Sequence, residues 1–130
     1  MITDLNVNND NILQTFLHAA NTHDFSLDIT FTVKGAVISG TMISAKNYFA
    51  KLSETFEEGN VVAKELSGQL AKASQAIKHD HTSKGQYVHL ENVKVYIGDS
   101  KPTPSTGDIL WRGKLSEIDG FFLGRISGDD

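Results

Sequence analysis

Between Phe25 and Val33, apolar and polar residues alternate strictly, and this pattern limits the possible folds more than any other in the chain. Such alternation is typical of a β-strand with one buried face. Lys34-Gly35 then favours a tight turn, and residues 36–43 return as a second strand rich in β-branched residues. Because a short turn joins antiparallel neighbours, residues 25–43 predict an antiparallel hairpin.

A second hairpin is predicted close to the C-terminus, where Asp119-Gly120 lies between apolar residues. Asp-Gly suits the two-residue turn whose central residues both need positive φ. The predicted strands cover about residues 109–118 and 121–126. Gly113 and Gly124 lie inside them, and glycine within a strand usually marks a bend or the close approach of another backbone. We therefore expect a sharply curved sheet.

The same stretch holds the three aromatic residues of the candidate interaction surface, Trp111, Phe121 and Phe122. Successive residues of a strand face opposite sides, so one of the two phenylalanines is expected outside the core. Trp111, on the preceding strand, is expected close to it. Clustered exposed aromatic residues mark an interface more often than a solvated surface, which predicts at least a dimer through this hairpin. The alternative is that both faces of this hairpin are buried, one by the barrel interior and one by the helices.

A third strand is predicted over residues 87–97, with a change of phase part-way. Val88 and Leu90 face one side, whereas the apolar residues after Glu91-Asn92 would face the other side of a regular strand. A bulge or tight bend is therefore expected at Glu91-Asn92. His89 is expected to line one face of this strand.

Two regions have the apolar spacing of amphipathic helices. The first runs from a cap at Asn9 or Asp10 to about residue 21. The second covers about residues 44–78, with Ser44 as its N-cap. A glycine at position 59 either ends a first helix or kinks a single one. Both helical regions are expected to pack on the sheet.

Together these elements predict a single α+β domain over residues 1–130. The expected fold is an N-terminal helix plus a five-stranded, strongly bent antiparallel sheet or a partly closed Sm-like or SH3-like barrel. A helical insertion, about residues 44–78, lies between strands two and three. Residues 1–9 are expected to form a flexible arm, residues 10–127 the folded core and residues 128–130 a tail.

Composition argues against several classes of function. The net charge of −4 over 130 residues argues against a surface built to bind nucleic acid. The absence of cysteine excludes disulfides, thiolate metal sites and cysteine nucleophiles. No apolar run approaches the length of a transmembrane span, and the N-terminus lacks the regions of a signal peptide. A cytoplasmic protein without membrane contact is expected.

No recognisable group of catalytic residues occurs in the sequence, so neither enzyme activity nor a cofactor is expected. No serine lies in a nucleophile elbow. His79-Asp80-His81 has the spacing of a chelating pair, but a structural or catalytic metal site needs about three or four ligands, so a polar linker is favoured. The loop over residues 98–107 lacks the spacing of a P-loop and is interpreted as a plain connection.

Several short blocks of the sequence form a recognisable set. They are Phe25-Ser26-Leu27-Asp28-Ile29, Gly35-Ala36-Val37-Ile38-Ser39-Gly40-Thr41, Ile43-Ser44-Ala45-Lys46 followed by Tyr48-Phe49, Gly98-Asp99-Ser100-Lys101 with Pro104-Ser105, Trp111-Arg112-Gly113-Lys114 and Asp119-Gly120-Phe121-Phe122-Leu123-Gly124. In their order and spacing these blocks resemble the gas vesicle accessory protein GvpU family. The resemblance covers about residues 10–127, with divergence in the N-terminal arm and around residues 60–86.

The resemblance implies a cytoplasmic, non-enzymatic accessory protein of gas vesicles. Such a protein acts by protein–protein contacts, modulating vesicle assembly or clustering, and its expected partners are the vesicle shell or other gas vesicle proteins. A homo-oligomer is also expected, without nucleic acid or membrane as a partner. The resemblance supplies no active-site motif.

The alternative is an Sm-like RNA-binding protein. An N-terminal helix followed by short strands, with Arg112-Gly113 in the fourth, resembles the Sm-like barrel. Such a protein should carry a basic surface, whereas this chain is acidic with dispersed charges. The place of the Asp and Asn signature of RNA-binding members is taken here by Ser44-Ala45-Lys46-Asn47-Tyr48.

Overall fold

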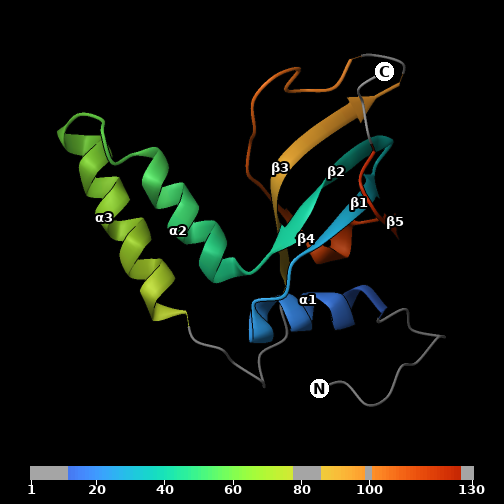
Figure 1. The fold of residues 1–130 in the computed structure, drawn as a ribbon, viewed down its shortest axis with the longest axis horizontal. Helices are drawn as coiled ribbons and strands as arrows, with labels where there is room; N and C mark the ends of the chain where they lie inside the picture. The colour runs from blue at the N-terminus through green and yellow to red at the C-terminus, as the bar shows by residue number, and fades with distance from the viewer. Residues whose placement is uncertain (1–11, 78–85, 99–100, 127–130) are drawn as a thin grey trace.

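The computed structural model describes residues 12–77, 86–98 and 101–126 (Figure 1). The predicted cap at Asn9 or Asp10 and the segment His79-Asp80-His81 lie outside these ranges. In chain order the elements are α1 (Ile12–His23), β1 (Leu27–Val33), β2 (Ala36–Ile43), α2 (Ala45–Thr55), α3 (Val61–Ala76), β3 (Tyr87–Ile97), β4 (Trp111–Lys114), the 3₁₀ helix η1 (Leu115–Glu117) and β5 (Gly120–Leu123).

All five strands pair antiparallel in one sheet, in the order β4-β3-β2-β1-β5. β4 and β5 are therefore its two edges. No pairing joins these edges within the described ranges, so the sheet is not closed. Together with the three α-helices, this arrangement confirms the α+β class and the five-stranded antiparallel sheet.

The hairpin of β1 and β2 matches its prediction closely. Val33 pairs with Ala36, and the turn between them consists of Lys34 and Gly35. Both turn residues have positive φ, 50° and 88°. This backbone twist matches the twist of the flanking strands, which is why a tight two-residue turn forms here.

The predicted C-terminal hairpin is wrong. β4 pairs with β3 and β5 pairs with β1, so the two expected partners lie at opposite edges of the sheet. Asp119 donates its N–H to the Thr32 carbonyl at 2.8 Å, and its carboxylate accepts the Lys34 N–H at 2.8 Å. Gly120 already pairs with Thr32 as the first residue of β5. Hydrogen bonds to a distant strand thus override the local turn preference of Asp-Gly.

The predicted bulge in β3 is confirmed. Ser39 pairs with Lys94, but Thr41 pairs with Glu91, so β3 contains one more residue than β2 between these pairs. Asn92 takes up the extra length with a φ of 54°. Gly40 lies opposite, where a Cβ would stand 2.9 Å from the carbonyl oxygen of Glu91. The bulge therefore requires glycine at that position.

α1 supplies the helical side of the core. Leu13, Leu17 and Ala20 recur on one face of this helix, and all three are buried. Figure 1 shows the helix lying across one end of the sheet. The buried strand residues that complete this core are Ile29, Phe31, Ile38, Met42, Val88, Leu90 and Val93.

α2 and α3 form a helical pair that extends away from the sheet (Figure 1). The Ser44 side chain accepts the Asn47 N–H, and the Asn60 side chain accepts the Ala63 N–H. These caps begin the two helices. The predicted cap at Ser44 and the interruption near residue 59 are both confirmed. Within the described part of the chain, no helix is long and apolar enough to cross a membrane.

Serines join the two helices of this pair. Ser53 donates to the Ser67 carbonyl at 2.8 Å, and Ser74 donates to the Lys46 carbonyl at 2.9 Å. The hydroxyls are buried but satisfied, because each finds an acceptor on the other helix. The sequence predicted that the helical region packs on the sheet. α2 contacts β3, whereas α3 packs on α2 and stands clear of the sheet in Figure 1.

Candidate interaction surface

Trp111 faces the core side of the sheet. It pairs with the buried Leu90, and paired residues of an antiparallel ladder share a face. Its half-buried ring packs against the hydrophobic core and covers Gly113, where any Cβ would overlap the indole. Gly113 does mark a close approach, but the approaching group is a side chain of its own strand and not the second backbone that the sequence predicted.

Phe121 and Phe122 face opposite sides of β5, as predicted. Phe121 pairs with Phe31 on the core face, and its ring meets that of Phe16 edge-on at a centroid distance of 6.2 Å. Phe122 pairs with Thr30 on the other face and is 50% exposed. Of the three aromatic residues of the candidate surface, only Phe122 is exposed. They do not form one cluster.

The exposed Phe122 lies on an edge strand with little protection. One side of β5 pairs with β1, and the other side pairs with no described residue. Its sequence, Gly-Phe-Phe-Leu, contains no charge, and Leu123 is 55% exposed. The opposite edge, β4, carries the exposed cations Arg112 and Lys114. Charged side chains on an edge discourage pairing with another chain, so among the described residues β5 is the less protected edge.

The segment after β5, residues 124–126, forms hydrogen bonds on the face of the sheet opposite the core and so fixes this edge strand. Thr30 donates to the Gly124 carbonyl at 2.8 Å, and Ile126 donates its N–H to the Ser39 hydroxyl at 2.8 Å. Arg125 donates to the Asn92 carbonyl at 2.6 Å. Thr30 and Ser39 are buried for this reason. Thr30 is one of the polar residues that alternate with apolar ones between Phe25 and Val33, and its short hydroxyl side chain is the signal in the sequence that fits a covering segment.

His89 has a strongly shifted pKa. Arg112 Nε donates to His89 Nε2 at 3.1 Å, which leaves the imidazole proton on Nδ1. Burial, and then the Arg112 charge, lowers the pKa of His89 to about 4. Tyr48 of α2 packs on the imidazole at a centroid distance of 4.6 Å, and Arg112 lies 4.0 Å from the centre of the Tyr87 ring. This stack fastens α2 to β3.

The surroundings of His89 are sufficient to account for its lowered pKa. The imidazole is only 3% exposed and neutral, and its contacts are an aromatic ring and a guanidinium. The prediction that it lines a strand face is confirmed. Within residues 12–77, 86–98 and 101–126, no three His, Asp or Glu side chains are placed to hold a metal ion.

The family is decided by a comparison of the whole sequence. A family profile described as "Gas vesicle protein GvpU-like" matches residues 10–126. The chain belongs to the GvpU-like family. The match includes all described strands and helices, and it confirms the resemblance carried by the short blocks. No curated protein and no solved structure matches the chain. The comparisons support association with gas vesicles and give no support to Sm-like RNA binding.

Proposed function

We propose that this chain is a cytoplasmic, non-enzymatic accessory protein of gas vesicles that modulates vesicle assembly or clustering through protein–protein contacts. Family membership supports the association with vesicles. The unprotected β5 edge, with its exposed Phe122, supports a contact function and is the observation on which the proposal rests. Its partners are the vesicle shell or other gas vesicle proteins, together with a second copy of this chain.

Self-association through β5 follows from the chemistry of the edge. Its outward N–H and C=O groups can pair with an identical strand across a two-fold axis, which extends the sheet from one copy into the next. Phe122 and Leu123 would then lose exposed apolar surface. A dimer offers two contacts to vesicles, and two linked contacts bind more tightly than one.

We infer that residues 10–127 form one domain in which the strongly bent sheet is a partly closed barrel and the helical pair is an insertion. Ile43 at the end of β2 pairs with His89 near the start of β3, so the chain leaves and re-enters the sheet at neighbouring positions. No residue of α2 or α3 belongs to the described hydrophobic core.

Self-association is tested by light scattering over a series of protein concentrations. The wild-type chain should reach at least a dimer, and Phe122→Asp should weaken the association at least about tenfold, because it places a charge in the apolar contact. Phe25→Asp is the matched control, since Phe25 is 46% exposed but lies outside the strands. A strict monomer at high concentration, or equal weakening by both variants, contradicts the β5 interface.

Vesicle association is tested separately by flotation with purified gas vesicles. The wild-type chain should rise with the vesicles and gather them into clusters visible by light microscopy. Phe122→Asp should still rise but should cluster vesicles less, because it removes the contact between copies. A wild-type chain that stays in the lower fraction contradicts the accessory function whatever its oligomeric state.

A further inference from the structure

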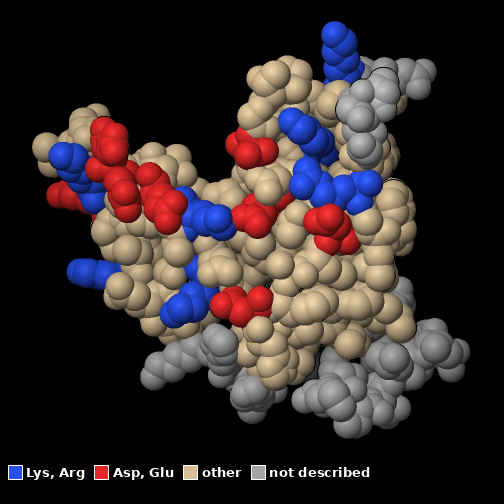
Figure 2. Space-filling model, in the orientation of Figure 1, with Lys and Arg blue, Asp and Glu red and all other residues tan. Residues whose placement is uncertain are grey.

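A cleft separates helix α2 from the segment that leads into β4. α2 forms one wall, residues 108–110 form the other, and the bulged part of β3 forms the floor. Its volume is about 490 Å³, and it is open to solvent. Figure 2 shows the molecule hollowed between the helical pair and the sheet, with acidic side chains on both sides of the hollow. The volume suits a few side chains of a partner.

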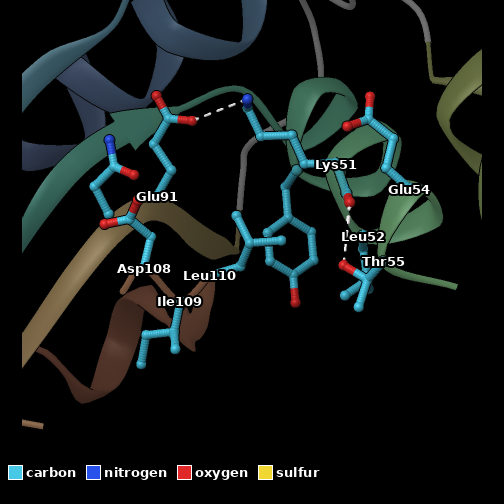
Figure 3. A pocket seen from close by; sticks show the side chains of 10 residues that line it. Lys51, Leu52, Glu54, Thr55, Glu91, Asp108, Ile109 and Leu110 are labelled. Atoms are coloured by element: carbon cyan, nitrogen blue, oxygen red, sulfur yellow. Dashed lines mark hydrogen bonds and ion pairs between the residues drawn. The ribbon is translucent and has the colours of Figure 1, made fainter. Parts of the chain in front are cut away.

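The inner surface of the cleft is mainly apolar. Leu52 contributes from α2, and Ile109 and Leu110 contribute from the opposite wall (Figure 3). Ile109 is 40% exposed, although a large aliphatic side chain at this position gains by being covered. The surface between the two walls therefore favours an apolar side chain.

The charges around the cleft are unbalanced. Lys51 lies 3.2 Å from a carboxylate oxygen of Glu91, so these two charges compensate each other (Figure 3). Glu54 on the α2 wall and Asp108 on the opposite wall also line the cleft. Neither forms an ion pair with a described residue. Two carboxylates on facing walls thus remain uncompensated and repel anions from the opening.

The walls are held in place without a ligand. Lys94 donates to the carbonyl oxygens of Pro104 and Gly107, each at 3.1 Å. Val93 donates its N–H to the Ile109 carbonyl at 3.2 Å. These bonds tie the wall of residues 108–110 to β3, while the stack of Tyr48 on His89 fixes α2. A preformed site loses less conformational entropy on binding than a mobile one.

We propose that this cleft binds a segment of a partner protein in which an apolar side chain is flanked by lysine or arginine. The apolar residue covers Ile109 and Leu110, and the flanking cations meet Glu54 and Asp108. Nucleic acid and anionic lipid have the wrong charge for the opening. The cleft lies on α2 and β3, apart from the β5 edge, so this site is independent of the self-association proposed above.

Synthetic fluorescent peptides test the proposal without vesicles. The probe is a short peptide in which leucines alternate with lysines, and the comparison peptides replace every lysine by glutamate or every leucine by serine. Fluorescence anisotropy should detect binding of the leucine–lysine peptide alone. Its affinity should fall as the salt concentration rises from about 50 to 500 mM, because the exposed charges become screened. Absence of binding at millimolar peptide, or binding of the glutamate peptide, overturns the proposal.

Paired variants locate the binding site. Glu54→Gln with Asp108→Asn should weaken binding of the leucine–lysine peptide at least about tenfold and reduce its salt dependence. Glu57→Gln with Glu58→Gln is the matched control, because both residues are exposed carboxylates beyond the end of α2 and outside the cleft. It removes the same charge and should change the affinity less than about twofold. If both pairs of substitutions weaken binding equally, the attraction depends on net charge alone and the assigned site is wrong.

A third variant tests the apolar part separately. Ile109→Ser alters a side chain that is already 40% exposed, so the fold should persist, while the affinity should fall at least about threefold. Amide resonances shifted by the peptide should lie along α2 and around residues 108–110. Shifts centred elsewhere overturn the assignment. If Glu54→Gln with Asp108→Asn instead abolishes dimer formation in light scattering, the occupant is a second copy of this chain and the partner assignment is wrong.

Discussion

The ring of Trp111 on β4 lies 6.1 Å from the ring of Phe31 on β1, measured between centroids, although β3 and β2 separate these strands in the sheet. Two strands of a flat sheet at this separation would stand far beyond ring contact. The sheet is therefore bent so strongly that its core face meets itself. Trp111 packs on the core because of this curvature, and the position of its ring depends on Gly113 beneath the indole.

Gly113→Ala should destabilise the fold by roughly 1–3 kcal/mol, because the new methyl group overlaps the Trp111 ring and must displace it from the core. Urea unfolding followed by tryptophan fluorescence measures the change. Gly68→Ala is the control: this glycine lies within α3, and nothing stands near its added Cβ. It should stabilise the chain by up to about 1 kcal/mol. A loss of stability in the control, or none at Gly113, contradicts the packing.

The sequence predicted the features that depend on local pattern. Alternation and a turn of two positive-φ residues were sufficient for β1 and β2, and the change of phase at Glu91-Asn92 revealed the bulge. Each of these features is decided by residues close together in the chain. The same reasoning predicted an interruption of the helical region near residue 59 and the Ser44 cap.

The sequence could not predict which strands become neighbours at the C-terminal end. Asp119-Gly120 fits a hairpin turn, but Asp119 instead bonds to Thr32 and Lys34, more than eighty residues away. No local pattern encodes such a pairing. Trp111 was misplaced next to the exposed phenylalanine for the same reason, since the prediction put the two β-edges side by side. The sequence could not predict the cleft either, because its two walls, α2 and residues 108–110, lie far apart in the chain.

Asp119→Ala should destabilise the fold by about 1 kcal/mol, because it removes the acceptor of the Lys34 N–H that joins η1 and β5 to the first hairpin. Glu117→Gln is the comparison. Its carboxylate lies 2.8 Å from Lys34 Nζ, but these side chains are 47% and 75% exposed, so the ion pair is screened by solvent. Its loss should destabilise the fold less than the loss of Asp119 does. Thermal unfolding at moderate salt measures both, and the reverse order of effects contradicts this account.

Stability should depend on pH through His89. Because its folded pKa of about 4 lies below the unfolded value of 6.5, the unfolded chain binds this proton first as the pH falls. The contribution of the neutral imidazole is therefore complete above about pH 6.5 and is lost between pH 6.5 and 4. The expected loss is of the order of 3 kcal/mol. Unfolding free energies at intervals across this range test the slope.

His89→Gln should flatten that slope, because glutamine carries no titrating group. Its stability near neutral pH should fall, since the imidazole that packs against Tyr48 is lost. His23→Gln is the control, because it removes an exposed histidine from the last turn of α1. An unchanged slope in His89→Gln assigns the pH dependence to other groups.

The helical pair of α2 and α3 should be dispensable for folding of the sheet. Replacing residues 46–85 by Asn-Gly should leave a folded sheet, because Ile43 and His89 are paired and a short turn can join the strands just beyond them. The described core contains no side chain from α2 or α3, so its packing should survive. The shortened chain should lose helical ellipticity but keep the tryptophan emission of the wild type, since Trp111 packs on Phe31. It should unfold at a lower temperature, because Tyr48 no longer covers His89.

The shortened chain should keep the β5 edge and its self-association, yet fail to bind the leucine–lysine peptide, because one wall of the cleft is gone. Loss of cooperative unfolding would show instead that the helical pair is part of the folding core.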